Sequence, residues 1–335
     1  MDGSFRNRLQ QLSDLDLAIL VALTGGLHCI IWSDPVILHE LRNELRLTCT
    51  ETFGLHAAVV DCSSKTTVDD FSEAILVEKY DTYDDVLDRD DGFGPPSLDA
   101  TSDRHLFNRA GSTLDERRIA DIIIAMNLDL APNNVQVQAL ELLRTKRIFS
   151  RTAMHSAPKN LCFIAVASKP GARLGHHLND LFGMSHHHPA DAELPHIEST
   201  MDALLPTFTR AELQALRDRA EAVNLTGEVD AYLHNIVIFL RQSRYVKGGI
   251  TATATRDLRA AARALAPLHG IDYVTPALVA LAARKVYPHR LVLTTASNER
   301  TLLWGSDPKA IGELLQGVQV EDVIEEVIGD VEVPL

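Results

Sequence analysis

Residues 253–290 read TATRDLRAAARALAPLHGIDYVTPALVALAARKVYPHR, and this stretch decides the fold. Alanine and leucine fill its first half, which favours a helix over 254–268, and a His-Gly pair then marks a turn. A Thr-Pro pair follows. Because Thr is a common N-cap and Pro is tolerated in the first helical turn, a second helix is expected over 275–286. The stretch therefore predicts two helices joined by a turn.

The chain before residue 200 has a different pattern. Short apolar runs predict strands at 28–32, 56–61, 122–126 and 161–167. Helical patterns alternate with them at 36–52, 66–76 and 133–147. Strands that alternate with helices indicate βαβ units and a parallel sheet. Two further helical patterns, at 210–223 and 229–246, place the rest of the chain in a helical region.

These patterns predict three parts. An α/β core covers residues 12–195, a helical domain covers 196–316, and an acidic amphipathic tail covers 317–335. Within the core, residues 78–112 combine an acidic run with Gly-Phe-Gly-Pro-Pro, which is typical of a solvated insertion. In the tail, apolar residues from Val320 to Ile328 recur at helical spacing and predict a stripe that docks on the helical domain or on another subunit.

The negative charge is concentrated in two segments. The chain has 335 residues and a net charge of −14, of which 78–91 carries −5 and 321–332 carries −6. The rest of the chain is nearly neutral, so no basic surface for nucleic acid or an anionic membrane is expected.

The four cysteines lie within or beside apolar runs and form no CxxC pair, which indicates buried thiols in a reducing compartment. No signal peptide and no apolar stretch long enough to span a membrane is visible in the sequence. We therefore expect a cytoplasmic or nuclear protein.

The ordered match of these elements carries a family resemblance. Arg256 opens the first helix of 253–290, Asp-Tyr-Val-Thr-Pro precedes the second, and the stretch ends in His-Arg. This pattern resembles the helical lid of the magnesium-chelatase ATPase subunits, a branch of the AAA+ ATPases, and is nearest to the chelatase-like proteins of non-photosynthetic eukaryotes. The resemblance implies a P-loop-NTPase-like AAA+ parallel sheet with a C-terminal all-α lid.

The residues that such an ATPase uses to bind phosphate are absent. A glycine-rich loop with a lysine is expected after the strand at 28–32, because backbone N–H groups must surround the phosphates. The chain has Ser-Asp-Pro-Val-Ile-Leu over 33–38, with no Gly and no Lys. Pro35 removes a donor, and the carboxylate of Asp34 would repel phosphate.

The catalytic positions have changed as well. By resemblance, the strand at 122–126 should end in an Asp for Mg²⁺ and a Glu for water, but Met126 and Asn127 stand there, with Asp129 as the nearby acid. Ser168, or Lys169 beside it, occupies the position of a polar sensor. Leu181 replaces the arginine finger.

Four positions therefore mark a vestigial nucleotide site: Ser33, Asp129, Ser168 and Arg256, the last matching the sensor arginine of the lid. The resulting hypothesis is a pseudo-ATPase that acts as an interaction or assembly module and needs no cofactor. The resemblance implies protein partners, either a ring of like subunits or a protein with a metal-dependent adhesion domain.

Two alternatives remain open from the sequence. In the first, the chain is an active ATP- and Mg²⁺-dependent chelatase-type or remodelling enzyme that recruits Asp129, Lys169 and Arg256. In the second, a histidine cluster binds a metal, with His176, His186 and His188 as candidate ligands. Alternate residues on a strand point to the same face, so His186 and His188 could lie on one side.

Overall fold

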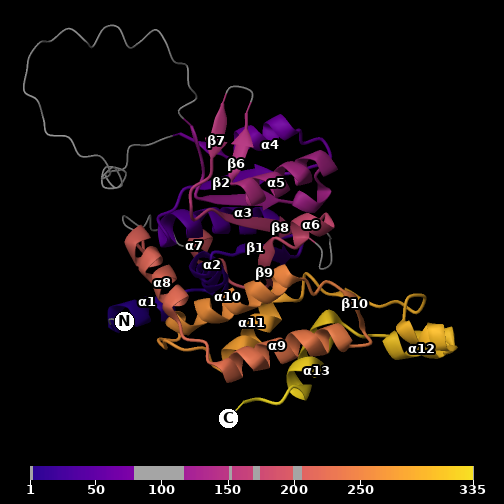
Figure 1. The fold of residues 1–335 in the computed structure, drawn as a ribbon. Helices are drawn as coiled ribbons and strands as arrows, with labels where there is room; N and C mark the ends of the chain where they lie inside the picture. Colours follow the sequence, from indigo (N-terminus) through magenta and orange to yellow (C-terminus); the bar gives the residue numbers. More distant parts are fainter. Residues whose placement is uncertain (1–2, 79–116, 151–152, 169–173, 199–205, 335) are drawn as a thin grey trace, which may run out of the picture.

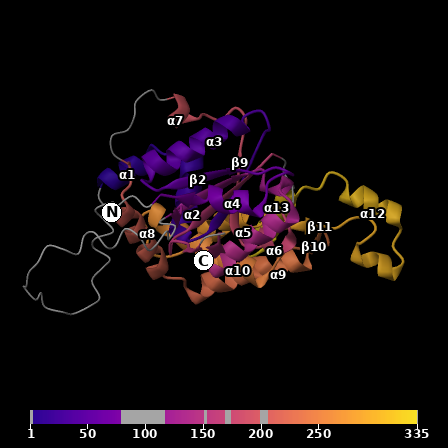
Figure 2. The same cartoon turned by 90° about the horizontal axis from the view of Figure 1, so that it is seen from above.

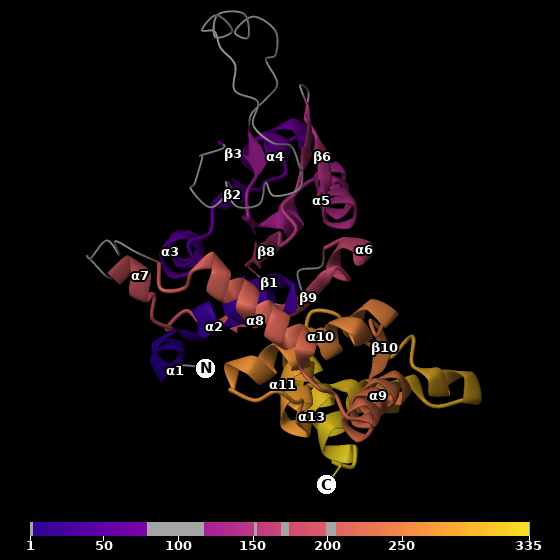
Figure 3. The same cartoon turned by 60° about the vertical axis from the view of Figure 1, so that its left-hand side comes forward.

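The computed structural model describes residues 3–78, 117–150, 153–168, 174–198 and 206–334 (Figure 1). The acidic insertion predicted at 78–112 lies almost entirely outside the described residues. In the views of Figures 1 and 3 the α/β part lies above and the helical C-terminal part below.

A five-stranded parallel sheet forms the centre of the α/β part. Its order is β2–β5–β8–β1–β9, with β1 at His28–Ser33, β2 at Ala57–Asp61, β5 at Ile122–Met126, β8 at Cys162–Ala167 and β9 at Phe182–His188. Four of these strands are those predicted from the apolar runs. The fifth, β9, has the sequence FGMSHHH, whose histidines hid it from the hydrophobic pattern.

Side chains alternate between two apolar cores, one on each face of the sheet. Strand β1 sends Cys29 and Ile31 to one core and Ile30 and Trp32 to the other. The first core contains α2 (Asp14–Gly25), α3 (Leu38–Leu47) and the helices of the lid. The second contains α4 (Val68–Ala74), α5 (Asn133–Thr145) and α6 (His176–Asn179). Strands buried on both faces explain the continuous apolar runs of the sequence.

Smaller elements complete the α/β part. They are α1 (Gly3–Gln10), a π-helical turn η1 (Thr48–Thr52), η3 (Leu128–Leu130), α7 (Pro195–Glu198), and the strand pairs β3–β4 (Leu76–Val77, Arg118–Ile119) and β6–β7 (Arg147–Phe149, Met154–Ser156). The predicted helix at 36–52 is therefore α3 followed by η1. Cys29, Cys49, Cys62 and Cys162 are buried and unpaired, as the sequence indicated.

The lid is built from four main helices: α8 (Arg210–Ala222), α9 (Gly227–Gln242), α10 (Ala252–Leu268) and α11 (Pro276–Val286). Threonines cap them, since Thr209, Thr226, Thr251 and Thr275 each accept a backbone N–H from the first turn. Helix α10 packs on α2, α8 and β9, so the lid and the sheet share one apolar core (Figure 3).

The tail helix α13 (Val320–Asp330) docks on this lid. Val323, Ile324 and Val327 are buried in the shared core, and α13 contacts α9 and α11. Arg284 of α11 donates two hydrogen bonds to Glu325, at 2.5 and 2.8 Å. The stripe predicted from the sequence therefore packs within its own chain.

A segment between the lid and the tail projects from the body in all three views (Figures 1–3). It follows the two-stranded pair β10–β11 (Val246–Gly248, Val292–Leu293) and contains η4 (Arg300–Trp304) and α12 (Pro308–Leu315). The sequence patterns did not predict this arm, because few of its side chains join either core. Among the described helices, none is both long and apolar enough to cross a lipid bilayer.

Candidate functional site

The carboxyl ends of the strands define the place where a ligand is expected in such a sheet. Helix α3 after β1 lies on one face, whereas α6 after β8 lies on the other. Adjacent strands whose following helices leave on opposite faces form a topological switch point, where ligands bind in open α/β sheets. Trp32 of β1 pairs with Ala167 of β8 at this point. Ser33 and Ser168, the next residue of each chain segment, therefore lie close together at the same edge of the sheet.

The turn that joins β1 to α3 spans only residues 34–37, and the N–H groups of Val36 and Ile37 are already used. The Asp34 carboxylate accepts the N–H of Val36 at 2.9 Å, and the Asp34 carbonyl accepts the N–H of Ile37 at 3.2 Å. Pro35 has no N–H to offer. A carboxylate and a carbonyl of the chain thus occupy two donors that a phosphate-binding loop would present to its ligand.

Ser33 also has a structural partner. Its side chain is 3% exposed, and its Oγ donates to the carbonyl oxygen of His188 at 2.9 Å. This bond ties the end of β1 to the end of β9. The hydroxyl is therefore committed to the sheet edge and does not face an open site.

The end of β5 carries no exposed pair of acids. Met126 is buried, and Asn127 adopts a left-handed conformation (φ 52°) while its N–H donates to the Val166 carbonyl at 2.7 Å. Asp129 follows in η3, where its charge affects the thiol of Cys62, the residue after β2. Burial, together with the charges of Asp61 and Asp129, raises the pKa of the Cys62 thiol to about 12.

The positions of the polar sensor and of the arginine finger also differ from those of an active ATPase. Ser168 is half-buried at the end of β8, and Lys169 lies outside the described residues. Leu181 is partly buried and packs against the core formed by α4, α5 and α6. An apolar side chain held in that core cannot supply charge to a neighbouring subunit.

Arg256, the fourth residue of the predicted nucleotide site, lies far from Ser33, Asp129 and Ser168 in the fold. Its Nη2 donates to Thr253 Oγ1 of its own helix at 3.4 Å, and its side chain is exposed. Thr251, the N-cap of α10, donates to Asp180 Oδ1 at 2.5 Å. The start of α10 is thereby fixed just before Phe182, the first residue of β9.

Arg290 reinforces this placement. It is 3% exposed, pairs with Asp257 of α10, and donates to the carbonyls of Asp180 (3.0 Å) and Phe182 (2.7 Å). Burial raises the pKa of Asp257, and the Arg290 cation opposes that change. Because Phe182 pairs with His28 at the start of β1, the Arg256 helix begins at the amino-terminal end of β9. Ser33 and Ser168 lie at the carboxyl-terminal end.

The histidines form no metal site in the part of the chain that the structure describes. His186 and His188 are buried and share one face of β9, as the alternation predicted, whereas His187 is exposed. His176 lies in α6, on a different element. No group of three or more His, Cys, Asp or Glu side chains among the described residues is arranged to hold a metal ion.

The sequence reasoning missed one buried ion pair near this edge. Glu44 of α3 is fully buried and accepts from His196 Nδ1 (2.7 Å) and from the backbone N–H groups of His196 (3.1 Å) and Ile197 (3.0 Å). Thr52 Oγ1 lies 2.8 Å from Nε2 of the same histidine. The partners are about 150 residues apart, so no local pattern could have signalled them.

Comparisons with known proteins agree with this architecture. The family model described as AAA lid domain matches residues 238–310. The solved structure of a "putative ATPase" from Cytophaga hutchinsonii superposes with a TM-score of 0.65 over 99% of this chain and 96% of that one, at 15% identity. The parallel sheet and helical lid thus form a P-loop-NTPase-like AAA+ fold, and at this identity the likeness shows the fold alone.

Two curated proteins are similar over shorter stretches. The uncharacterized protein YeaC of Bacillus subtilis is 27% identical over 135 residues, which is 40% of this chain and 37% of YeaC. Maintenance of telomere capping protein 2 of Lachancea thermotolerans is 26% identical over 117 residues, which is 33% of this chain and 41% of that protein. The chain thus spans about two fifths of the length of the curated relatives it matches.

Proposed function

We propose that this chain is a AAA+ pseudo-ATPase of the magnesium-chelatase type, which serves as an interaction or assembly module. The observation that carries the proposal is the turn after β1, where Asp34 accepts the N–H of Val36 in place of a phosphate. The proposed subfamily rests on the resemblance of residues 253–290 to the chelatase lid.

The altered positions act together. The β1–α3 turn has no Gly and no Lys, Met126 cannot bind a hard cation, and Leu181 replaces the finger. Phosphate binding and transition-state charge stabilisation would both be lost, and each contributes orders of magnitude to the rate of phosphoryl transfer. Among the positions of the predicted nucleotide site, Arg256 keeps a side chain that could bind phosphate. Its helix, however, begins at the amino-terminal end of β9, opposite the β1–α3 turn.

An interaction role has separate support on the projecting arm. Trp304 at the end of η4 is 88% exposed, and Leu314 of α12 is 40% exposed. Tryptophan is enriched among the residues that contribute most to protein interfaces, because a large apolar surface gains much on burial. The proposed partners are like subunits in a ring or a protein with a metal-dependent adhesion domain, as the chelatase resemblance implies.

We expect no ATP turnover from the purified chain. Phosphate release in ATP and Mg²⁺ should not exceed that of a protein-free blank, because no described group can position the attacking water. The assay is repeated with Arg256→Ala, which should change nothing. Turnover that disappears in Arg256→Ala would contradict the proposal and restore the active-enzyme alternative.

Light scattering tests the assembly role. A complex larger than the single chain of 36.9 kDa is expected at high concentration, and Trp304→Ala should shift it toward one chain. Val36→Ala is a matched control, since Val36 is 84% exposed but lies at the edge of the sheet and not on the arm. Equal masses for Trp304→Ala and Val36→Ala would show that the arm is not part of the interface.

A further inference from the structure

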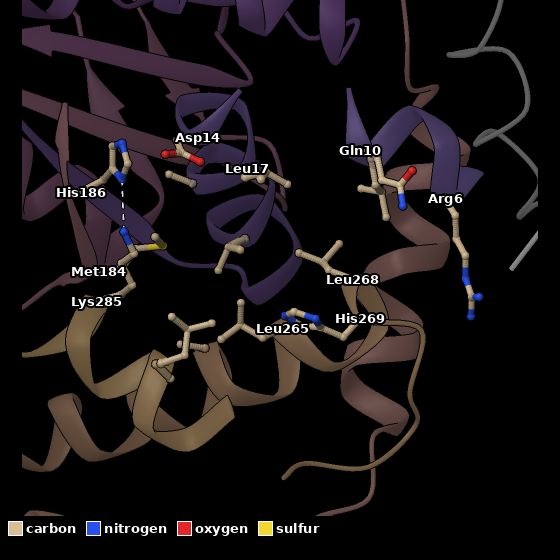
Figure 4. Close-up of a pocket in the computed structure, with 16 residues that line it drawn as sticks. Arg6, Gln10, Asp14, Leu17, Met184, His186, Leu265, Leu268, His269 and Lys285 are labelled. Atoms are coloured by element: carbon tan, nitrogen blue, oxygen red, sulfur yellow. Dashed lines mark hydrogen bonds between the residues drawn. The ribbon is translucent and has the colours of Figure 1, made fainter. Parts of the chain in front are cut away.

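A cavity of about 650 Å³ lies at the seam between the sheet part and the lid (Figure 4). Its walls come from α1, α2 and β9 on one side and from α10 and α11 on the other. Most of the lining is apolar and includes Leu17, Val21, Met184, Leu265, Leu268 and Leu281. A volume of this size, with apolar walls and a few polar groups, is typical of small-molecule sites.

One end of the cavity holds a cation and a buried histidine. Lys285 Nζ lies 3.3 Å from His186 Nδ1, and His186 is only 8% exposed. Burial, together with the nearby charge of Lys285, lowers the pKa of His186 to about 3, so the ring is neutral. A neutral ring that accepts from Lys285 through Nδ1 carries its proton on Nε2. Nε2 is buried and has no hydrogen-bond partner in the described chain.

The charge of Lys285 is not neutralised by a carboxylate. Asp14 also lines this end (Figure 4), yet it is exposed and forms no ion pair with Lys285, and no other acid among the described residues does. The Lys285 backbone is fixed, since its carbonyl accepts from Ser185 Oγ at 3.3 Å. A cation without a carboxylate partner at an apolar wall favours an anionic acceptor.

The opposite end of the cavity is polar and open. Arg6 and His269 lie there, both exposed (Figure 4). A ligand with a single anionic group and an apolar body would place its charge at Lys285 and its body along the leucines. A nucleotide is a poorer fit, because several phosphate charges would face one lysine and the carboxylate of Asp14.

We propose that this cavity binds an amphiphilic monocarboxylate of the acyl type, with Lys285 as the group that holds the carboxylate and His186 Nδ1 as the acceptor that positions its ammonium. The site is separate from the carboxyl-end turn after β1, so it does not depend on the loss of ATPase activity. Because its walls come from both parts of the fold, a ligand there stabilises the packing of the lid on the sheet.

Calorimetric titration of the full chain with decanoate and with decan-1-ol tests the proposal. The two probes share an apolar chain and differ in the anionic group. Decanoate should bind at least about tenfold more tightly than decan-1-ol, and it should raise the thermal unfolding midpoint as its concentration rises. Equal affinities for the two probes, or no binding of either at millimolar concentration, would overturn the site.

Three variants separate the charge from general folding effects. Lys285→Met should weaken decanoate at least about tenfold while leaving decan-1-ol unchanged. Leu17→Trp should weaken both probes, because it fills the cavity. Lys247→Met, at an exposed position of β10 outside the cavity, should change neither. A decanoate affinity that survives Lys285→Met would show that the carboxylate is not held by Lys285.

Discussion

Replacing Glu44 with alanine is expected to lower the free energy of unfolding by about 2–3 kcal/mol, because it removes a buried hydrogen-bonded carboxylate and the counter-charge of the partly buried His196. The Glu44 side chain is fully buried, and its two oxygens accept three hydrogen bonds from His196 and Ile197. The substitution removes all three bonds and leaves their donors on His196 and Ile197 without this acceptor. Urea denaturation measures the change.

Glu40→Ala is the matched control. Glu40 lies one turn earlier on the same helix, and its side chain is exposed. Its replacement should change stability by less than about 0.5 kcal/mol. If the two variants unfold at the same urea concentration, then the Glu44–His196 pair contributes nothing to the connection between α3 and α7.

The same pair makes stability depend on pH. The hydrogen bond to Glu44 raises the pKa of His196 above its ordinary 6.5, so its contribution is complete below pH 6.5 and is lost as pH rises through the higher folded value. Burial alone would raise the pKa of Glu44, but the bonds from His196 and Ile197 outweigh it, and the pKa lies below the ordinary 4.5. That contribution is lost as pH falls through the lower folded value.

The pair should therefore stabilise the fold most between about pH 4.5 and 6.5, and the Glu44→Ala effect should shrink on either side. A Glu44→Ala penalty that stays constant from acid to alkaline pH would contradict this assignment.

Gly249→Ala is expected to destabilise the lid by at least about 3 kcal/mol. Gly249 has φ +102°, a conformation that residues with a side chain rarely adopt. An added Cβ would lie 2.0 Å from the carbonyl oxygen of Arg290. That carbonyl belongs to the buried arginine that joins Asp257 to the start of β9, so the backbone cannot move away without breaking those bonds.

Gly248→Ala provides a control at the next position. A Cβ on Gly248 meets no atom within 4 Å, and its φ is not in the left-handed region. Its effect should stay below about 1 kcal/mol. The thermal unfolding midpoints of the two variants give the comparison. Equal midpoints would show that the close approach of Gly249 to Arg290 does not affect stability.

Much of the fold could be predicted because its signals are local. Thr251 and Thr275 cap the helices that the sequence placed at 254–268 and 275–286, and the apolar runs became strands buried on both faces. β9 was missed because His186 and His188 are buried polar residues, which the hydrophobic pattern treats as exposed. Their alternation with His187 was the available signal.

The position of Arg256 could not be predicted from its motif. Motif matching places a sensor arginine next to the β1 turn, whereas the helix that carries it is anchored at Asp180 and Phe182. These anchors join residues 71 and 108 positions apart, so they are set by tertiary packing. The bond between Asp34 and Val36 is different, because it joins residues only two positions apart and was a local signal; the sequence reasoning considered only the repulsion of phosphate by Asp34.

The most direct test of the account is calorimetric titration of the full chain with ATP and ADP, with and without Mg²⁺. Because Asp34 occupies the N–H groups of Val36 and Ile37, and Pro35 has none, we predict no binding at millimolar nucleotide. Micromolar, Mg²⁺-dependent binding of ATP would contradict the account and show that this turn still holds phosphate.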